Sequence, residues 1–467
     1  MDQGNWYTFL KYLGLVVGCI AKFTSGSLFV FSAYQNAIKE TFNYTQTEVE
    51  LLSSCLNLGL GTGFLPGMIF DKFGPHLTSG IGLIISGGSY FLIWSTTKSV
   101  KFYEPRSGLM AFYFYLAGFG SLFSYMAALN TNAINFPAKH RGKVISLLNA
   151  FFTGSPSVFV SIYYNVFSDG DYNIVKNQHY DKLMFFFAIL FIVMNAMCIV
   201  CLHDLSKLQG PETKSAYTVE NSTDSNHVQS GMDSAVNSIE GSKKNTEERK
   251  DDSIKFILLL KDPSFHLLAY TFMSAAILSL VNTNNLTVLT KSVGLNHFDN
   301  TLLLVMPIVN TIISFLIGPV SDKIKGKIPR LTLLVIGCVF FTASELVYVF
   351  FGTYLAGVIC SVIITAFGIG TLWSLVPTIV SEMFGIRDFG RNWGLLLMLA
   401  GVAGLGGQAI FGFLYDSRVR SDNIYCYGKD CTIYGYILMA VLGLISIALS
   451  AILDIRQRYR EKYNQIL

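Results

Sequence analysis

Long apolar runs alternate with short polar turns along almost the whole chain. Each run holds about 20 residues, the length that a helix needs to cross about 30 Å of hydrocarbon. Because lipid offers no partners for free backbone groups, each run is expected to be helical. The pattern predicts twelve transmembrane helices, at residues 9–36, 47–70, 76–96, 109–136, 142–167, 182–203, 264–289, 300–321, 329–352, 355–384, 390–415 and 431–454.

A long polar segment separates the first six helices from the last six. Residues 205–262 are rich in Ser, Asn, Thr, Asp, Glu and Lys, and they offer too little apolar surface to offset the entropy of ordering. We therefore expect an N-terminal bundle over 1–204, a disordered cytosolic linker over 205–262 and a C-terminal bundle over 263–467. The linker is either a plain tether or an element controlled by phosphorylation.

Composition and charge agree with a membrane protein and set its orientation. The chain is 52% hydrophobic and 14% charged, whereas a soluble domain carries about 25% charged residues. The net charge of +4 is small and scattered, which argues against a nucleic-acid partner. Basic residues follow the even-numbered helices, at Lys139, Arg141, Lys143, Lys323, Lys325, Lys327, Arg330, Arg387, Arg391, Arg456, Arg458, Arg460 and Lys462. The positive-inside rule places this side and both termini in the cytosol.

Two short patterns recur at nearly the same separation in the two halves. The second helix ends in a Gly67, Asp71, Lys72 pattern, and the eighth helix ends in the same spacing at Gly318 and Asp322, 251 residues later. Arg141 after helix four and Arg391 after helix ten are 250 residues apart. Such repeats predict two related bundles, which in many secondary transporters hold the substrate site between them.

Small residues recur every fourth position in helices two and eleven. They are Gly59, Gly63 and Gly67 in the former, and Ala400, Gly404 and Gly412 in the latter, with Gln408 at the same spacing. We expect the first set to form one smooth stripe down a continuous helix. Small residues let helices approach closely in lipid, so either plain packing or sliding contact explains them.

The glycine and Asp-Lys turn resembles the cytoplasmic loop motif of the major facilitator superfamily. Further residues resemble its nodulin-like branch, which includes plant nuclear-fusion-defective-type proteins and fungal vacuolar homologues of monocarboxylate transporters. These residues are Ser25-Gly26-Ser27, Phe31-Ser32-Ala33-Tyr34, Asn57-Leu58-Gly59, Pro377 to Gly385 and Cys426 to Cys431. The resemblance covers both halves but not the linker.

That resemblance implies an all-α membrane protein of twelve helices in two pseudo-symmetric six-helix bundles. It implies transport by alternating access, in which helices two and eleven face each other across the halves. Asp71 and Asp322 would then hold the cytosolic gate by accepting from helix-start N–H groups and meeting Arg141 or Arg391. The glycines Gly59, Gly63 and Gly67 would belong to the same gate.

Lys22 is the leading candidate for substrate binding. It lies about twelve residues into helix one, roughly 18 Å along the axis, and ionisable residues at such depth are functional candidates. No acid in the predicted spans is an obvious partner, which favours an anionic solute over water or a backbone carbonyl. Glu345 is also deep, but helix nine is expected to be peripheral, which favours packing or snorkelling. Further candidates are Asn57, Tyr125, Ser155, Asn282, Asn310, Trp373 and Gln408.

The function predicted is transport of a small polar or anionic, monocarboxylate-like metabolite by a uniporter or proton-coupled symporter. The proton-coupled monocarboxylate mechanism does not carry over, because its first-helix lysine falls near Phe31 or Ser32 and helix eight lacks acids before Asp322. A carrier of amino acids or neutral metabolites and a non-transporting receptor or scaffold remain as alternatives. We expect no enzyme activity, cofactor or metal site, and a monomer in the plasma membrane or a vacuolar or lysosomal membrane.

Cys426 and Cys431 lie in the last outer loop. That side of the membrane permits disulfides, and Gly428 lets the intervening chain turn back. A disulfide between the two is expected.

Overall fold

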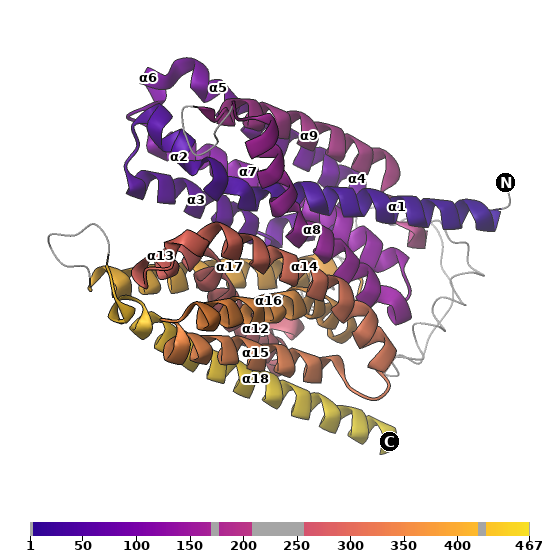
Figure 1. Ribbon diagram of the computed structural model, residues 1–467. Helices are drawn as coiled ribbons and strands as arrows, with labels where there is room; N and C mark the ends of the chain where they lie inside the picture. The colour runs from indigo at the N-terminus through magenta and orange to yellow at the C-terminus, as the bar shows by residue number, and fades with distance from the viewer. Residues whose placement is uncertain (1–2, 170–176, 208–255, 419–425, 467) are drawn as a thin grey trace.

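The computed structural model describes residues 3–169, 177–207, 256–418 and 426–466, and its helices form two bundles (Figure 1). Helices α1 to α9 make the first bundle, and α12 to α18 make the second. Both chain termini lie at the same end of the molecule, which we call the terminal end. The opposite end carries the loop between α17 and α18, and we call it the loop end.

The first bundle is built from segments whose bounds follow the apolar runs of the sequence. They are α1 (Gln3–Ser25), a 3₁₀ turn (Gly26–Val30), α2 (Phe31–Phe42), α3 (Gln46–Gly61), α4 (Phe64–Gly82), a π turn (Leu83–Gly87), α5 (Gly88–Thr96), a 3₁₀ turn (Thr97–Ser99), α6 (Val100–Tyr103), α7 (Ser107–Asn135), α8 (Ala138–Val166) and α9 (Tyr180–Cys201). A short 3₁₀ turn (Leu205–Lys207) follows.

The second bundle is simpler. It contains α12 (Pro263–Asn284), α13 (Leu286–Ser292), a 3₁₀ turn (Asn296–Phe298), α14 (Asp299–Ile324), α15 (Arg330–Phe351), α16 (Leu355–Met383), α17 (Phe389–Asp416), a 3₁₀ turn (Lys429–Cys431) and α18 (Ile433–Ile466). Residues 256–261, just before α12, are also helical.

The described residues contain eleven helical segments long and apolar enough to cross a membrane. One of them, Leu51–Tyr103, has 53 residues and reverses at Gly74. Gly74 has φ 80° and ψ −172°, a backbone conformation that glycine adopts without a Cβ clash. This segment therefore crosses twice, so the described residues of the two bundles together make the twelve crossings that the sequence predicts.

The expectation of one smooth glycine stripe in the second crossing was wrong. The crossing is broken between α3 and α4, because Thr62 has a non-helical ψ of 52° and Gly63 N–H donates to the Gly61 carbonyl at 2.8 Å. The break rotates the two parts relative to each other. A Cβ at Gly59 would overlap the Tyr115 carbonyl in α7, within its own bundle. Gly63 and Gly67 instead face α17 of the other bundle.

The expected linker, 205–262, lies mostly outside the described residues. Its two described ends contradict a fully disordered segment. Leu205 is buried in the turn after α9, and Leu259 is buried in the helical stretch before α12. Phe256 packs against Phe64 of α4 with tilted rings, 5.7 Å apart between ring centres. These apolar side chains pack on the bundles, which is why the ends are ordered.

The two bundles meet along two main helix pairs, α4 with α17 and α8 with α14. Apolar side chains such as Ile84, Val200 and Phe413 face outwards and are more than two-thirds exposed. An exposed apolar belt of this kind is suited to lipid contact. The buried interface between the bundles is therefore the place to look for a polar functional site.

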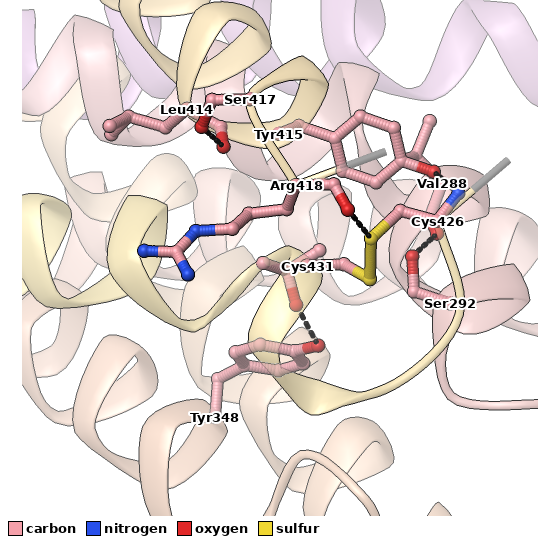
Figure 2. The surroundings of a disulfide bond; sticks show 10 residues. Val288, Ser292, Tyr348, Leu414, Tyr415, Ser417, Arg418, Cys426 and Cys431 are labelled. Carbon is pink, nitrogen blue, oxygen red and sulfur yellow. Dashed lines mark hydrogen bonds between the residues drawn. A yellow bond between two sulfur atoms is a disulfide. The ribbon is translucent and has the colours of Figure 1, made fainter. Parts of the chain in front are cut away.

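Cys426 and Cys431 form a disulfide at the loop end, the pairing expected from the sequence (Figure 2). The same loop is fixed to both neighbouring segments. The backbone N–H of Gly428 donates to the Ser292 carbonyl of α13 at 2.8 Å, and that of Cys426 donates to the Tyr415 hydroxyl of α17 at 3.1 Å.

In unreduced protein, the peptide carrying Cys426 and Cys431 is expected to resist alkylation and to be two hydrogens lighter than after reduction. The bond holds because the six other cysteines, all free, lie elsewhere in the fold and cannot exchange with it. Mass spectrometry of the denatured protein checks this, with alkylation of Cys360 as the internal control. Two free thiols in freshly isolated protein would contradict the pairing.

Candidate functional site

A carboxylate of the first bundle contacts a helix start of the second at the terminal end. Asp71 follows the apolar part of α4, and its oxygens accept the backbone N–H groups of Gly390 at 3.0 Å and Arg391 at 2.6 Å. These N–H groups belong to the first turn of α17, where no intrahelical partner exists and the helix dipole favours negative charge. The contact contributes up to about 2 kcal/mol to the closed arrangement.

The second bundle makes the equivalent contact with the first. Asp322, at the end of α14, accepts the backbone N–H of Lys143 in the second turn of α8 at 2.9 Å. It also forms an ion pair with Arg330. Arg330 bonds Glu382 at 2.6 Å, and Lys325 reaches the same carboxylate at 3.2 Å. The terminal end is thus closed by two pseudo-symmetric contacts, the second of them embedded in a charge network.

The side chains of the two arginines expected to face these carboxylates, Arg141 and Arg391, contact other groups. The hydrogen bond from Arg391 to Asp71 comes from its main chain, while its guanidinium lies 3.6 Å from Asp388 and 5.0 Å from the Phe256 ring centre. Arg141 donates from Nε to the Ala133 carbonyl of its own bundle at 3.1 Å.

Sequence reasoning assigned no gate role to Arg330, which is the arginine that pairs with Asp322, or to Glu382. Arg330 stood among several basic loop residues, and nothing in the sequence distinguished it from them.

Glycines bring the two bundles into backbone contact beside Asp71. A Cβ at Gly67 would overlap the carbonyl oxygen of Gly390, and one at Gly63 would lie 2.9 Å from the Gly394 carbonyl oxygen. Only hydrogen fits at these positions. The same half of α4 therefore supplies both the carboxylate and the close approach that seals the terminal end.

Lys22 lies in α1 and is fully buried. Its Nζ is 3.1 Å from the ring centre of Tyr125 and 4.9 Å from that of Phe152, and it has no hydrogen-bond partner in the described part of the chain. Four residues later the helix tightens into the 3₁₀ turn, where a Cβ at Gly26 would overlap the Phe152 carbonyl. Insertion of a lysine at this depth costs at least about 2.5–3.5 kcal/mol, and a desolvated cation–π contact returns about 2 kcal/mol. The ammonium is therefore incompletely compensated.

An aromatic group from the second bundle borders this lysine site. The Tyr125 hydroxyl lies toward the indole of Trp393 in α17, whose Nε1 has no partner with good hydrogen-bond geometry. Trp393 packs on Phe272 at 5.3 Å between ring centres, and Phe272 packs on Trp373 at the same distance. Trp373, the candidate chosen from the sequence, is thus one ring farther from Lys22 than Trp393.

Neutral polar side chains connect the bundles between α8, α14 and α16. Asn149 Nδ2 lies 3.3 Å from the hydroxyls of both Ser314 and Ser374, and Thr153 lies 3.5 Å from Thr311. The Asn149 Oδ1 atom is buried and has no partner among the described residues. Asn149 was missed from the sequence, although an Asn in the middle of an apolar span was the available signal.

Of the remaining candidates, three form hydrogen bonds within the protein, and two are available to bind a solute. Ser155 donates to the Phe152 carbonyl at 3.1 Å, Asn282 donates to Glu345 at 2.6 Å, and Asn310 accepts from Ser314 at 3.3 Å. Asn57 is half-buried on α3, and Gln408 has a buried Nε2 without a partner in the region described. The candidates therefore do not converge on one cavity, and Lys22 with Tyr125 forms the most distinctive pair.

The two-bundle architecture and the paired carboxylate contacts at one end define a multi-pass membrane transporter. A family model described as "Major Facilitator Superfamily" matches residues 15–396. The chain belongs to the Major Facilitator Superfamily, as its sequence motifs indicated.

Relatives and solved structures agree with this family. A "Probable transporter MCH1" from Debaryomyces hansenii is 24% identical over 439 residues, covering 89% of this chain and 87% of the relative. One from Wickerhamomyces anomalus is 22% identical, covering 87% and 80%.

Among solved structures, the transporter FucP in the outward conformation matches with a TM-score of 0.62 at 11% identity, covering 95% of this chain and 99% of FucP. The proton:xylose symporter XylE matches with a TM-score of 0.65 at 13% identity, covering 94% and 95%. At these identities the two structures support the fold alone.

Proposed function

We propose that the chain moves a small anionic, monocarboxylate-like metabolite across a membrane by alternating access. Lys22 is the anion-binding residue, and the contacts of Asp71 and Asp322 form the gate on the cytosolic side. The observation that carries the proposal is the buried Lys22 ammonium, which rests on the Tyr125 ring and has no acid partner among the described residues. An anionic solute would supply the missing charge.

The arrangement fits a carrier better than a receptor or scaffold. The gate contacts join different bundles through few hydrogen bonds, so they can break without disrupting either core. Lys22 has no exposed surface while the terminal end is closed, so a solute needs a further opening to reach it. In this account the basic residues at the terminal end place both termini in the cytosol, and the membrane is the plasma membrane or a vacuolar or lysosomal membrane.

A carrier of neutral polar metabolites is the second candidate. The Asn149, Ser314 and Ser374 cluster favours it, because amide and hydroxyl groups bind neutral polar solutes through hydrogen bonds. The cluster lies on the interface between the bundles, as a substrate site in this kind of transporter would.

A thermal-shift screen on purified protein tests these alternatives. A ligand that binds only the folded state stabilises it by about 2.7 kcal/mol at 100 times its Kd. We expect monocarboxylates to raise the unfolding temperature and neutral amino acids to leave it unchanged, with uptake of the stabilising solute into proteoliposomes. Stabilisation by neutral amino acids alone would favour the second candidate, and binding without uptake would favour a receptor.

A further inference from the structure

The second bundle holds a buried carboxyl group that neither the gate nor Lys22 uses. Glu345 lies in α15 and is fully buried. Its Oε1 accepts a hydrogen bond from Asn282 Nδ2 of α12 at 2.6 Å. Its Oε2 has no hydrogen-bond partner in the described ranges. Of the two roles expected from the sequence, packing and snorkelling, snorkelling is therefore wrong, because the side chain reaches no surface.

The groups around Glu345 are polar but uncharged. Tyr436 of α18 faces it, and Tyr348 of its own helix packs on Tyr436 with tilted rings at 3.9 Å between ring centres. The Tyr348 hydroxyl forms a hydrogen bond with the Thr432 hydroxyl at 3.1 Å. From α16, Ser361 donates to the Ser344 carbonyl one residue before Glu345.

No Lys, Arg or His among the described residues forms an ion pair with Glu345. Burying a carboxylate without a cation is very costly, so this closed arrangement favours the neutral acid.

A small cavity lies beside Asn282, the hydrogen-bond partner of Glu345. Its lining includes Asn282, Tyr348, Ser361, Thr365 and Tyr436, and it offers about 10 Å³ to the centre of a water-sized sphere. That is close to the space one water molecule needs. A water held there would have hydroxyl and amide partners, and it would lie beside the Asn282 side chain that bonds Glu345.

The partner of Glu345 lies beside a break in the seventh crossing. Asn282 is in the last turn of α12, and Asn285 separates α12 from α13 with non-helical φ of −102° and ψ of 10°. α12 packs on α17, which carries the gate contact with Asp71. A change of charge on Glu345 would therefore act on the helix that joins this site to the gate.

We propose that Glu345, held by Asn282, is the binding site for a proton whose uptake and release accompany solute movement. The inference rests on the proposed transport function and adds its coupling ion. In the state described here the side chain is the neutral acid. In a state that admits water, the acid gives its proton to a water molecule, leaving a carboxylate and a hydronium ion, and the reverse step reloads it.

Infrared difference spectroscopy on the purified full-length protein tests the proton site without any solute. At neutral pH the wild type is expected to show the carbonyl stretch of a buried carboxylic acid, which disappears on alkaline titration. Glu345→Gln should lack this band. Asp454→Asn is the matched control, since Asp454 is paired with Arg458, and this variant should keep the band.

A spectrum of Glu345→Gln identical to the wild type overturns the proposal, as does a wild type without a titrating acid band. Loss of the band on adding NaCl at constant pH also overturns it, because the site would then bind sodium. If Glu345→Gln is not recovered folded, Glu345→Asp replaces it, and the band must move in frequency. These readouts are independent of flux, so failure of the transport proposal would be seen separately.

Discussion

Lys22→Ala is expected to abolish binding and uptake of the anionic solute while leaving the protein folded. A hydrogen bond to a charged group contributes about 1.5–3 kcal/mol, which corresponds to a loss of about 10- to 100-fold in affinity. Because burying the ammonium costs more than its contact with Tyr125 returns, the variant should unfold at an equal or higher temperature. Binding by thermal shift and uptake into proteoliposomes measure the two effects on the same preparation.

Two further variants separate anion binding from a structural role for Lys22. Lys22→Arg keeps the charge and should retain part of the affinity with altered selectivity. Lys11→Ala is the matched control, because Lys11 lies on the same helix and rests on the Phe136 ring at 4.4 Å, nearer the terminal end. Unchanged solute affinity in Lys22→Ala would assign this lysine to packing.

Gly67→Ala is expected to prevent full closure of the proposed gate at the terminal end and to reduce uptake strongly. The added Cβ would overlap the Gly390 carbonyl oxygen, a backbone atom that can move only if α4 and α17 separate. Overpacking of this kind costs about 1–3 kcal/mol, which shifts the equilibrium between closed and open states by about 5- to 150-fold. The initial rate of solute uptake measures this loss.

Gly80→Ala is the control, because Gly80 lies just beyond the reversal at Gly74, in the next crossing, and its Cβ would meet nothing within 4 Å. It should transport at the wild-type rate. Wild-type uptake by Gly67→Ala at equal abundance would show that close approach at this position is dispensable.

The sequence located the helices well but not their interruptions. An apolar run of about 20 residues crosses lipid as a helix, so the crossings and the turn at Gly74 follow from the pattern. The break at Thr62 did not, since glycines at every fourth position read as one helix face whether or not the helix continues. Packing against α7 on one side and α17 on the other decides that geometry.

Site residues could be predicted where they lay deep in an apolar span or recurred at the same place in both halves of the chain. Lys22 was found by its depth, and Asp71 by its repeat at Asp322. The side chains that these residues contact could not be predicted from the sequence, because those contacts depend on distances in the folded structure. Tyr125 was weighed as a hydrogen-bonding group, yet its ring face contacts Lys22. Asn282 was weighed as a substrate ligand, yet it holds Glu345.

The central claim is that the contact between Asp71 and the start of α17 opens and closes during transport. The most direct test measures the distance between spin labels at positions 72 and 387, which are exposed on opposite sides of this contact. Wild type should show a dominant short distance, and Asp71→Asn should shift the population to a longer one without loss of folding. A single distance that is the same in wild type, in Asp71→Asn and with bound solute would contradict the account.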